Sequence, residues 1–396
     1  MKTTAQILRD YRGPALFSFG FRPFFLLASV WAALAVPLWM LALFGAGEDM
    51  AAIFTRDWHV HEMLFGYTGA VIVGYMIVAG ANWTGHYPVA GRPVVLLAAL
   101  WIAGRAAMLA ISALGPAAAV IDAAFLVLFA LAMWREQLAA SNWRSLGPCI
   151  VISLIAIADI GFHARAIVPE LGPASERMAL GLVTFLITLM GGRLVPSFTS
   201  NWMMQQKIKP VPPPPGRFDQ ATVGVTGAAI LLWLLLPSSP LTGATLVVAG
   251  TGLFVRLLRW RGWVAGRDGM VLILHLGYFW CVLGLVLLGA SILAPADVPV
   301  TAAVHALTAG AIGVMTLAMM TRTSRSHTGR ERRADEITLV IYALVNAAAV
   351  MRVLAPFLIP IHLELLGLSS ACWSLAFALF ALSYGPMLTR PWRRRT

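Results

Sequence analysis

Residues 269–290 read GMVLILHLGYFWCVLGLVLLGA, and this stretch decides the class of fold. It contains no Asp, Glu, Lys or Arg. At about 1.5 Å per helical residue it is long enough to cross the hydrocarbon core of a bilayer, which is about 30 Å thick. A helix that is apolar on every face has no side to turn toward water, whereas lipid solvates all of its faces. The stretch therefore predicts a transmembrane helix.

The composition extends this prediction to the whole chain. Of its 396 residues, 59% are hydrophobic and 12% are charged, whereas soluble domains carry about 25% charged residues. These values exclude a soluble enzyme and a disordered chain. Apolar runs of about 17–25 residues predict an all-α polytopic membrane protein with about 12 transmembrane helices, in a single domain over residues 1–396. The predicted spans are 23–45, 61–82, 93–114, 116–134, 146–168, 176–197, 221–237, 240–260, 269–290, 300–321, 335–357 and 366–388.

The basic residues indicate how these spans are oriented. Most of the 29 Lys and Arg residues fall in alternate connections between the spans. Because Lys and Arg accumulate in cytoplasmic loops, this asymmetry predicts that the N- and C-termini are both cytoplasmic. The same bias accounts for the net charge of +12, so we expect no nucleic acid among the partners.

A repeated spacing connects the second and the tenth span. Thr84 follows His61 at the same distance at which Thr328 follows His305. Because four spans restore the direction of the chain, this match predicts three parallel repeats of four helices. The predicted repeats cover residues 1–145, 146–268 and 269–396.

Histidines are the main candidates for chemistry in this apolar chain. An imidazole inside a bilayer is costly and is usually paired or bound to a ligand. Imidazole nitrogen suits copper, iron and zinc, and haem iron commonly takes an axial histidine. The predicted orientation divides the histidines into an outer and an inner group, which would suit a haem with a copper or two haems. The outer group is His59, His61, His163 and His305, and the inner group is His86, His275 and His327.

All of these histidines are predicted metal ligands. Haem contacts are expected from four of them, His61, His275, His305 and His327. Three arginines in or near the spans are expected to pair with the haem propionates, namely Arg105, Arg193 and Arg352. We expect Asp122 and Asp159 to be counter-charges for buried arginines. The alternative is that histidines in loops, such as His86 and His327, are only solvated, and that the others are structural.

Six short motifs are spread over nearly the whole chain. They are Phe21-Arg22-Pro23-Phe24-Phe25, Trp58-His59-Val60-His61-Glu62-Met63, Asn82-Trp83-Thr84-Gly85, Gly192-Arg193 through Asn201, His275 with Gly277-Tyr278, and His305 through Arg330. Together they resemble the NnrS family. In the second motif that family commonly has Ala where Val60 stands, a change that should not disturb a ligand. The resemblance implies a bacterial inner-membrane protein that contains haem, which we expect to be b-type, and copper. It also implies a role in nitric oxide metabolism and resistance to nitrosative stress, often beside denitrification.

Three functions are compatible with these expectations. In the first, the chain is a haem–copper protein that binds or redox-processes nitric oxide, as an oxidoreductase would. In the second, it is a membrane carrier that handles copper or another metal. In the third, it senses nitric oxide without turnover.

Overall fold

The computed structural model describes residues 11–84, 89–139 and 146–391. Within these ranges the regular structure is helical, without a β-strand, and 12 helices are long and apolar enough to cross a membrane. These helices are Phe21–Leu43, Arg56–Gly80, Arg92–Leu109, Pro116–Ala139, Gly147–Ala164, Leu171–Gln205, Arg217–Leu235, Pro240–Arg259, Gly269–Leu293, Val300–His327, Glu336–Phe357 and Ile359–Thr389. The predicted fold class is confirmed, and the chain is an all-α multi-pass membrane protein.

The chain divides into two compact units. Unit 1 comprises Met1–Ala179, Thr323–Glu331 and Phe377–Thr396, and unit 2 comprises Leu180–Arg322 and Arg332–Ala376. Three of the boundaries fall inside the sixth, tenth and twelfth spans. The units are therefore defined by packing, and the three four-helix repeats stay a prediction, as does the cytoplasmic location of both termini.

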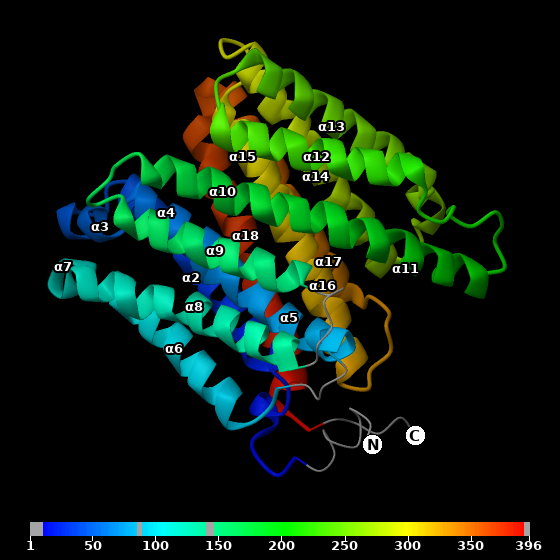
Figure 1. The fold of residues 1–396 in the computed structure, drawn as a ribbon, viewed down its shortest axis with the longest axis horizontal. Helices are drawn as coiled ribbons and strands as arrows, with labels where there is room; N and C mark the ends of the chain where they lie inside the picture. The colour runs from blue at the N-terminus through cyan, green and yellow to red at the C-terminus, as the bar shows by residue number, and fades with distance from the viewer. Residues whose placement is uncertain (1–10, 85–88, 140–145, 392–396) are drawn as a thin grey trace. The chain divides into compact units, whose positions relative to one another are not determined.

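Unit 1 contains the first five spans. Its helices are η1 (Ala15–Phe17), α2 (Phe21–Leu43), α3 (Glu48–Ile53), α4 (Arg56–His61), η2 (Glu62–Tyr67), α5 (Thr68–Thr84), α6 (Arg92–Leu109), α7 (Ile111–Leu114), α8 (Pro116–Ala139) and α9 (Gly147–Ala164). Helix α8 packs against α6 on one side and α9 on the other, as the cyan and green ribbons of Figure 1 show. This arrangement brings polar residues of three helices to one place.

Local sequence fixes where two of these helices begin. The Thr55 side chain caps α4 by accepting a hydrogen bond from the backbone N–H of Trp58 at 3.1 Å, as threonine commonly does at a helix start. Gly115, with a positive φ of 54° that favours glycine, ends the turn after α7. Pro116 then opens α8, where its missing N–H costs no helical hydrogen bond.

Unit 2 contains most of the remaining spans. Its helices are η4 (Ile187–Gly191), α11 (Gly192–Gln205), α12 (Arg217–Leu235), α13 (Pro240–Arg259), η5 (Gly262–Ala265), α14 (Gly269–Leu293), α15 (Val300–His305), η6 (Ala306–Ile312), α17 (Glu336–Leu354), η7 (Ala355–Phe357) and η8 (Ile359–Ile361). Three helices belong partly to each unit: α10 (Leu171–Leu186), α16 (Gly313–His327) and α18 (His362–Thr389).

A buried ion pair joins two neighbouring helices of unit 2, α12 and α13, which lie side by side in Figure 1. Arg256 donates from Nε to Asp219 at 2.9 Å and from a terminal nitrogen to the Thr188 carbonyl and the Tyr278 hydroxyl, each at 3.2 Å. The pair therefore satisfies the general need of a charge inside a membrane span for a counter-charge.

Three spans contain a π-helical segment, η2, η4 and η6. Such segments are rare and frequently mark functional sites. Segments η2 and η6 each begin directly after a histidine, His61 and His305, and each has a glycine five residues after that histidine, Gly66 and Gly310. The second and tenth spans are therefore similar in helical geometry as well as in the spacing of their sequence motifs.

Candidate metal centre

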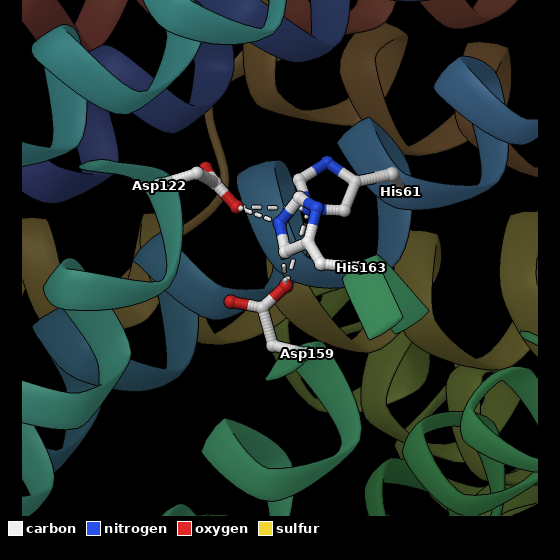
Figure 2. A group of neighbouring side chains, drawn as sticks. All are labelled: His61, Asp122, Asp159 and His163. Carbon is white, nitrogen blue, oxygen red and sulfur yellow. Dashed lines mark hydrogen bonds and ion pairs between the residues drawn. The ribbon is translucent and has the colours of Figure 1, made fainter. Parts of the chain in front are cut away.

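A cluster of two histidines and two aspartates lies inside unit 1 (Figure 2). His61 comes from the end of α4, Asp122 from α8, and Asp159 and His163 from α9. One ligand atom from each side chain lies within 4.8 Å of the other three, and the first three residues are buried. In the part of the chain that the structure describes, this is the one group of three or more His, Cys, Asp or Glu residues with such a spacing.

The local sequence explains why these side chains converge. Asp159 and His163 are four residues apart on α9, so they lie on the same face of the helix. That face is turned toward α8, where Asp122 is buried. His61 occupies the junction between α4 and the π-helical η2 and has no exposed surface. Three spans thus contribute to one site.

Nitrogen and oxygen atoms alternate around the cluster. His61 Nε2 lies 2.9 Å from Asp122 Oδ2 and 3.1 Å from Asp159 Oδ1. His163 Nε2 lies 3.0 Å and 3.7 Å from the same two oxygens. Ligands at about 2.0–2.1 Å from one ion are neighbours at about 2.9 Å in a square plane and about 3.4 Å in a tetrahedron. Three of the observed spacings also have the length of hydrogen bonds, and the four together are compatible with four ligands around a single metal ion.

The charges of the surrounding residues favour a divalent cation. Arg105 pairs with Glu62 at 2.7 Å and with Asp122. The site thus holds three carboxylates, those of Glu62, Asp122 and Asp159, but one guanidinium group, and all four residues are buried. With neutral imidazoles the group carries two uncompensated negative charges, which is expensive inside a membrane. A divalent ion between the four ligands would neutralise them.

Aromatic side chains keep water from the cluster. The rings of Phe65 and Phe162 lie 5.4 Å from the His61 ring, measured between centroids. Arg165 covers the Phe162 ring at 3.9 Å and pairs with Asp57 at 3.3 Å. Only the His163 side chain keeps an exposed fraction as large as 10%, compared with at most 2% for the other three ligands. The site is therefore dry, which strengthens electrostatic interactions within it.

Gly66 in η2 supports the cluster because its place cannot hold a side chain. A Cβ atom there would overlap the Arg105 guanidinium and would lie 2.8 Å from Glu62 Oε2. The Gly66 carbonyl meanwhile accepts a hydrogen bond from Trp101 Nε1 at 3.0 Å. The glycine thus allows η2 to approach α6 closely enough for Arg105 to reach Glu62.

We expect Gly66→Ala to destabilise the protein by about 3 kcal/mol, the upper part of the range for overpacked cores. The midpoint of thermal unfolding in detergent measures the effect. Gly147→Ala, at the start of α9, is the matched control because a Cβ atom there has no neighbour within 4 Å. Equal unfolding midpoints for the two variants would contradict this account of Gly66.

The other histidines of the predicted outer group have different surroundings. His59 stacks on Trp39 with ring centroids 4.2 Å apart. His305 belongs to unit 2, where its Nδ1 lies 2.7 Å from the Thr301 carbonyl oxygen. The structure brings His61 and His163 together, with ring centroids 4.8 Å apart. The ligand roles of His59 and His305 stay predictions.

The predicted inner histidines lie in both units or outside the described residues. His327 packs in unit 1 against Phe19 and Phe21, with ring centroids 5.5 Å and 5.7 Å away. His275 is buried in α14 of unit 2. His86 lies outside the described residues.

His275 has one hydrogen-bonded and one unpartnered nitrogen. The Thr199 hydroxyl donates to the Val195 carbonyl at 2.7 Å, so its oxygen accepts the Nε2–H of His275 at 2.9 Å. In the described part of the chain, His275 Nδ1 is buried and has no hydrogen-bond partner. A nitrogen lone pair that is buried and unpartnered beside an anchored N–H is what a metal-binding histidine offers.

The three predicted arginines differ in their surroundings. Arg105 is buried and already engaged by Glu62 and Asp122. Arg193 in α11 is exposed and Arg352 in α17 is half-buried. The expected pairing of Arg105 with Asp122 is thus present, and the pairing of these arginines with propionates stays a prediction.

From the sequence, Asp122 and Asp159 were expected only as counter-charges, and Glu62 had no expected role. The spacing of Asp159 and His163 was the signal that could have indicated a ligand pair, because it places both on one helix face. Glu62 follows directly after His61, and a neighbouring residue on an α-helix does not normally face the same way. Its role therefore depends on the π-helical turn that begins there.

The comparisons with known proteins agree with this picture. The family model described as "NnrS protein" matches residues 15–392. No curated protein matches the chain. Because the family model covers nearly the whole sequence, including all three helices that form the cluster, the chain belongs to the NnrS family.

Proposed function

We propose that this chain is a haem–copper membrane protein of nitric oxide metabolism, and that His61, Asp122, Asp159 and His163 bind its copper. The observation that supports this proposal most is the buried cluster with four convergent ligand atoms. Family membership supports the connection with nitric oxide. We place the protein in the bacterial inner membrane, as the family resemblance implies.

The chemistry of the ligands favours copper in the divalent state. Two imidazole nitrogens and two carboxylate oxygens form a set without sulfur. Square-planar or tetragonal sites of nitrogen and oxygen suit Cu(II), which also binds most tightly among the first-row divalent metals. The alternation of nitrogen and oxygen at 2.9–3.7 Å is compatible with that geometry.

His275 is the residue that would hold a haem iron. Its Nδ1 is buried without a hydrogen-bond partner in the described residues, and the Thr199 hydroxyl holds the opposite nitrogen. The Gly262 backbone lies directly against the imidazole, where a Cβ atom would overlap the ring. Haem bound there would supply an iron atom able to bind nitric oxide. Thr199 and Gly262 fix the orientation of the ring, and His305 and His327 stay candidates for further ligands.

His275→Ala is expected to abolish the Soret band of protein expressed with sufficient haem. The band depends on haem binding and not on activity, so it reports the axial ligand directly. His362→Ala is the control, because His362 stands at the start of α18, where its Nδ1 lies 2.8 Å from the Ala355 carbonyl oxygen. A full Soret band in His275→Ala would refute the assignment of His275.

Nitric oxide titration tests the proposed function as a whole. Purified, reduced protein is mixed anaerobically with nitric oxide while the Soret band and the dissolved nitric oxide are recorded. We expect the wild type to show a shift of the band and copper-dependent consumption of nitric oxide. We expect His61→Ala to keep the band and lose that consumption. No shift in the wild type, together with copper flux into proteoliposomes, would instead identify a metal carrier.

A further inference from the structure

Glu62 lies beside the metal cluster without being one of its ligands. It has no exposed surface, and its Oε1 lies 3.1 Å from His61 Nδ1. Its Oε2 accepts hydrogen bonds from Trp31 Nε1 at 2.6 Å and from Arg105 at 2.7 Å. Both carboxylate oxygens of Glu62 are therefore occupied by nitrogen groups.

These contacts determine which nitrogen of His61 carries the proton. A carboxylate oxygen accepts hydrogen bonds, and Oε2 of Glu62 already accepts two, from Trp31 and Arg105. The contact between Glu62 Oε1 and His61 Nδ1 is therefore an N–H that the imidazole donates. With a metal ion bound, the lone pair of Nε2 would face the ion, on the side where Nε2 lies 2.9 Å and 3.1 Å from the oxygens of Asp122 and Asp159.

We propose that Glu62 is the positioning residue that holds His61 in the Nδ1-protonated form, with Nε2 directed at the metal. This inference rests on the proposed copper site. Carboxylates that hold a metal-bound histidine in this way fix the ring and raise the basicity of the ligand nitrogen. The sequence pair His61-Glu62 thus provides a ligand and its anchor on consecutive residues.

Arg105 connects this anchor to a second ligand. One terminal nitrogen of its guanidinium group donates to Glu62 and the other donates to Asp122. A guanidinium group is planar and its donors form a fixed fork, so the two carboxylates are held in one geometry. Arg105 therefore couples the orientation of His61 to the position of the Asp122 carboxylate.

The test is Glu62→Gln, which keeps the size of the side chain. Glutamine has an amide NH₂ group in place of one carboxylate oxygen of Glu62. This NH₂ group would face either the N–H donors of Trp31 and Arg105 or the Nδ1 of His61. In either orientation a favourable hydrogen bond is lost. We expect the affinity for Cu(II) to fall about 10- to 100-fold, the usual effect of losing such a partner. Competition with a chelator of known affinity measures the change.

Pulsed EPR of the copper that remains bound separates positioning from a merely structural role. The echo modulation comes from the non-coordinated nitrogen of each copper-bound imidazole, which for His61 is the nitrogen facing Glu62. We expect one such coupling to change in Glu62→Gln. The control is Glu176→Gln, which also removes a carboxylate of unit 1 from an arginine, Arg56, at 2.8 Å. This control should keep both the affinity and the couplings.

The outcomes distinguish this inference from the proposed function. If the wild type binds copper at the cluster and Glu62→Gln keeps its affinity and its nitrogen couplings, the positioning role is refuted while the copper site stands. If the wild type binds no copper at the cluster, both are refuted. Should Glu62→Gln fail to fold, Glu62→Asp preserves the charge but shortens the side chain, and it must show the same altered coupling.

Discussion

His61→Ala is expected to lower the affinity of the protein for copper by more than about 100-fold. Loss of a residue that only hydrogen-bonds to a metal ligand commonly lowers metal affinity about 10- to 100-fold, and this variant removes a ligand itself. His61 Nε2 lies close to both aspartate oxygens, so its loss opens one corner of the four-atom set. Copper content after dialysis against a chelator, measured by elemental analysis, reports the loss.

Two further variants show whether the effect is specific to the cluster. His163→Ala should reduce copper content in the same way, because it removes the other imidazole nitrogen. His59→Ala should keep copper, since His59 stacks on Trp39 and lies outside the four-residue cluster. Equal copper content in all three variants would exclude the cluster as the copper site.

Asp122→Ala is expected to destabilise the protein by about 1–3 kcal/mol, the cost of leaving buried hydrogen-bond donors without an acceptor. Asp122 is the aspartate that contacts Arg105, His61 and His163 at once. Its loss leaves the buried Arg105 with Glu62 as its remaining carboxylate partner. Thermal unfolding in detergent, in the absence of copper, measures this effect separately from metal binding.

Asp159→Ala is the matched comparison. Asp159 also faces both histidines, but no ion pair joins it to Arg105 within the described residues. We expect its loss to abolish copper binding and to lower the unfolding temperature less than Asp122→Ala does. An equal or smaller effect of Asp122→Ala on the metal-free protein would contradict the role of Asp122 as the link to Arg105.

Hydropathy was sufficient to predict the membrane spans, because a helix in lipid must be apolar over a fixed length. The ends of the helices were less predictable. The sixth span was predicted over residues 176–197, whereas its helix covers Leu171–Gln205. Residues 198–205 include Ser200, Asn201 and Gln205, which fall outside an apolar window but still form helix. Hydropathy reports where lipid can solvate the chain and not where helical hydrogen bonding stops.

The candidate site was predictable only in part. The shared level of His61 and His163 followed from their positions near the same ends of two spans, and the structure brings them together. That Asp122 and Asp159 join them depends on which faces of α8 and α9 pack against each other. Helices that are apolar nearly all round carry little periodicity from which to predict those faces. The contact between His61 and Glu62 depends in addition on the π-helical turn.

In the proposed site, one copper ion is held by two imidazoles and two carboxylates. X-ray absorption at the copper edge of the purified wild-type protein tests it most directly, because it reports the type and distance of the ligand atoms. We expect a shell of nitrogen and oxygen at about 2.0 Å with the scattering of two imidazoles, and no sulfur. A sulfur scatterer at about 2.3 Å, or a shell without imidazole, would contradict the claim.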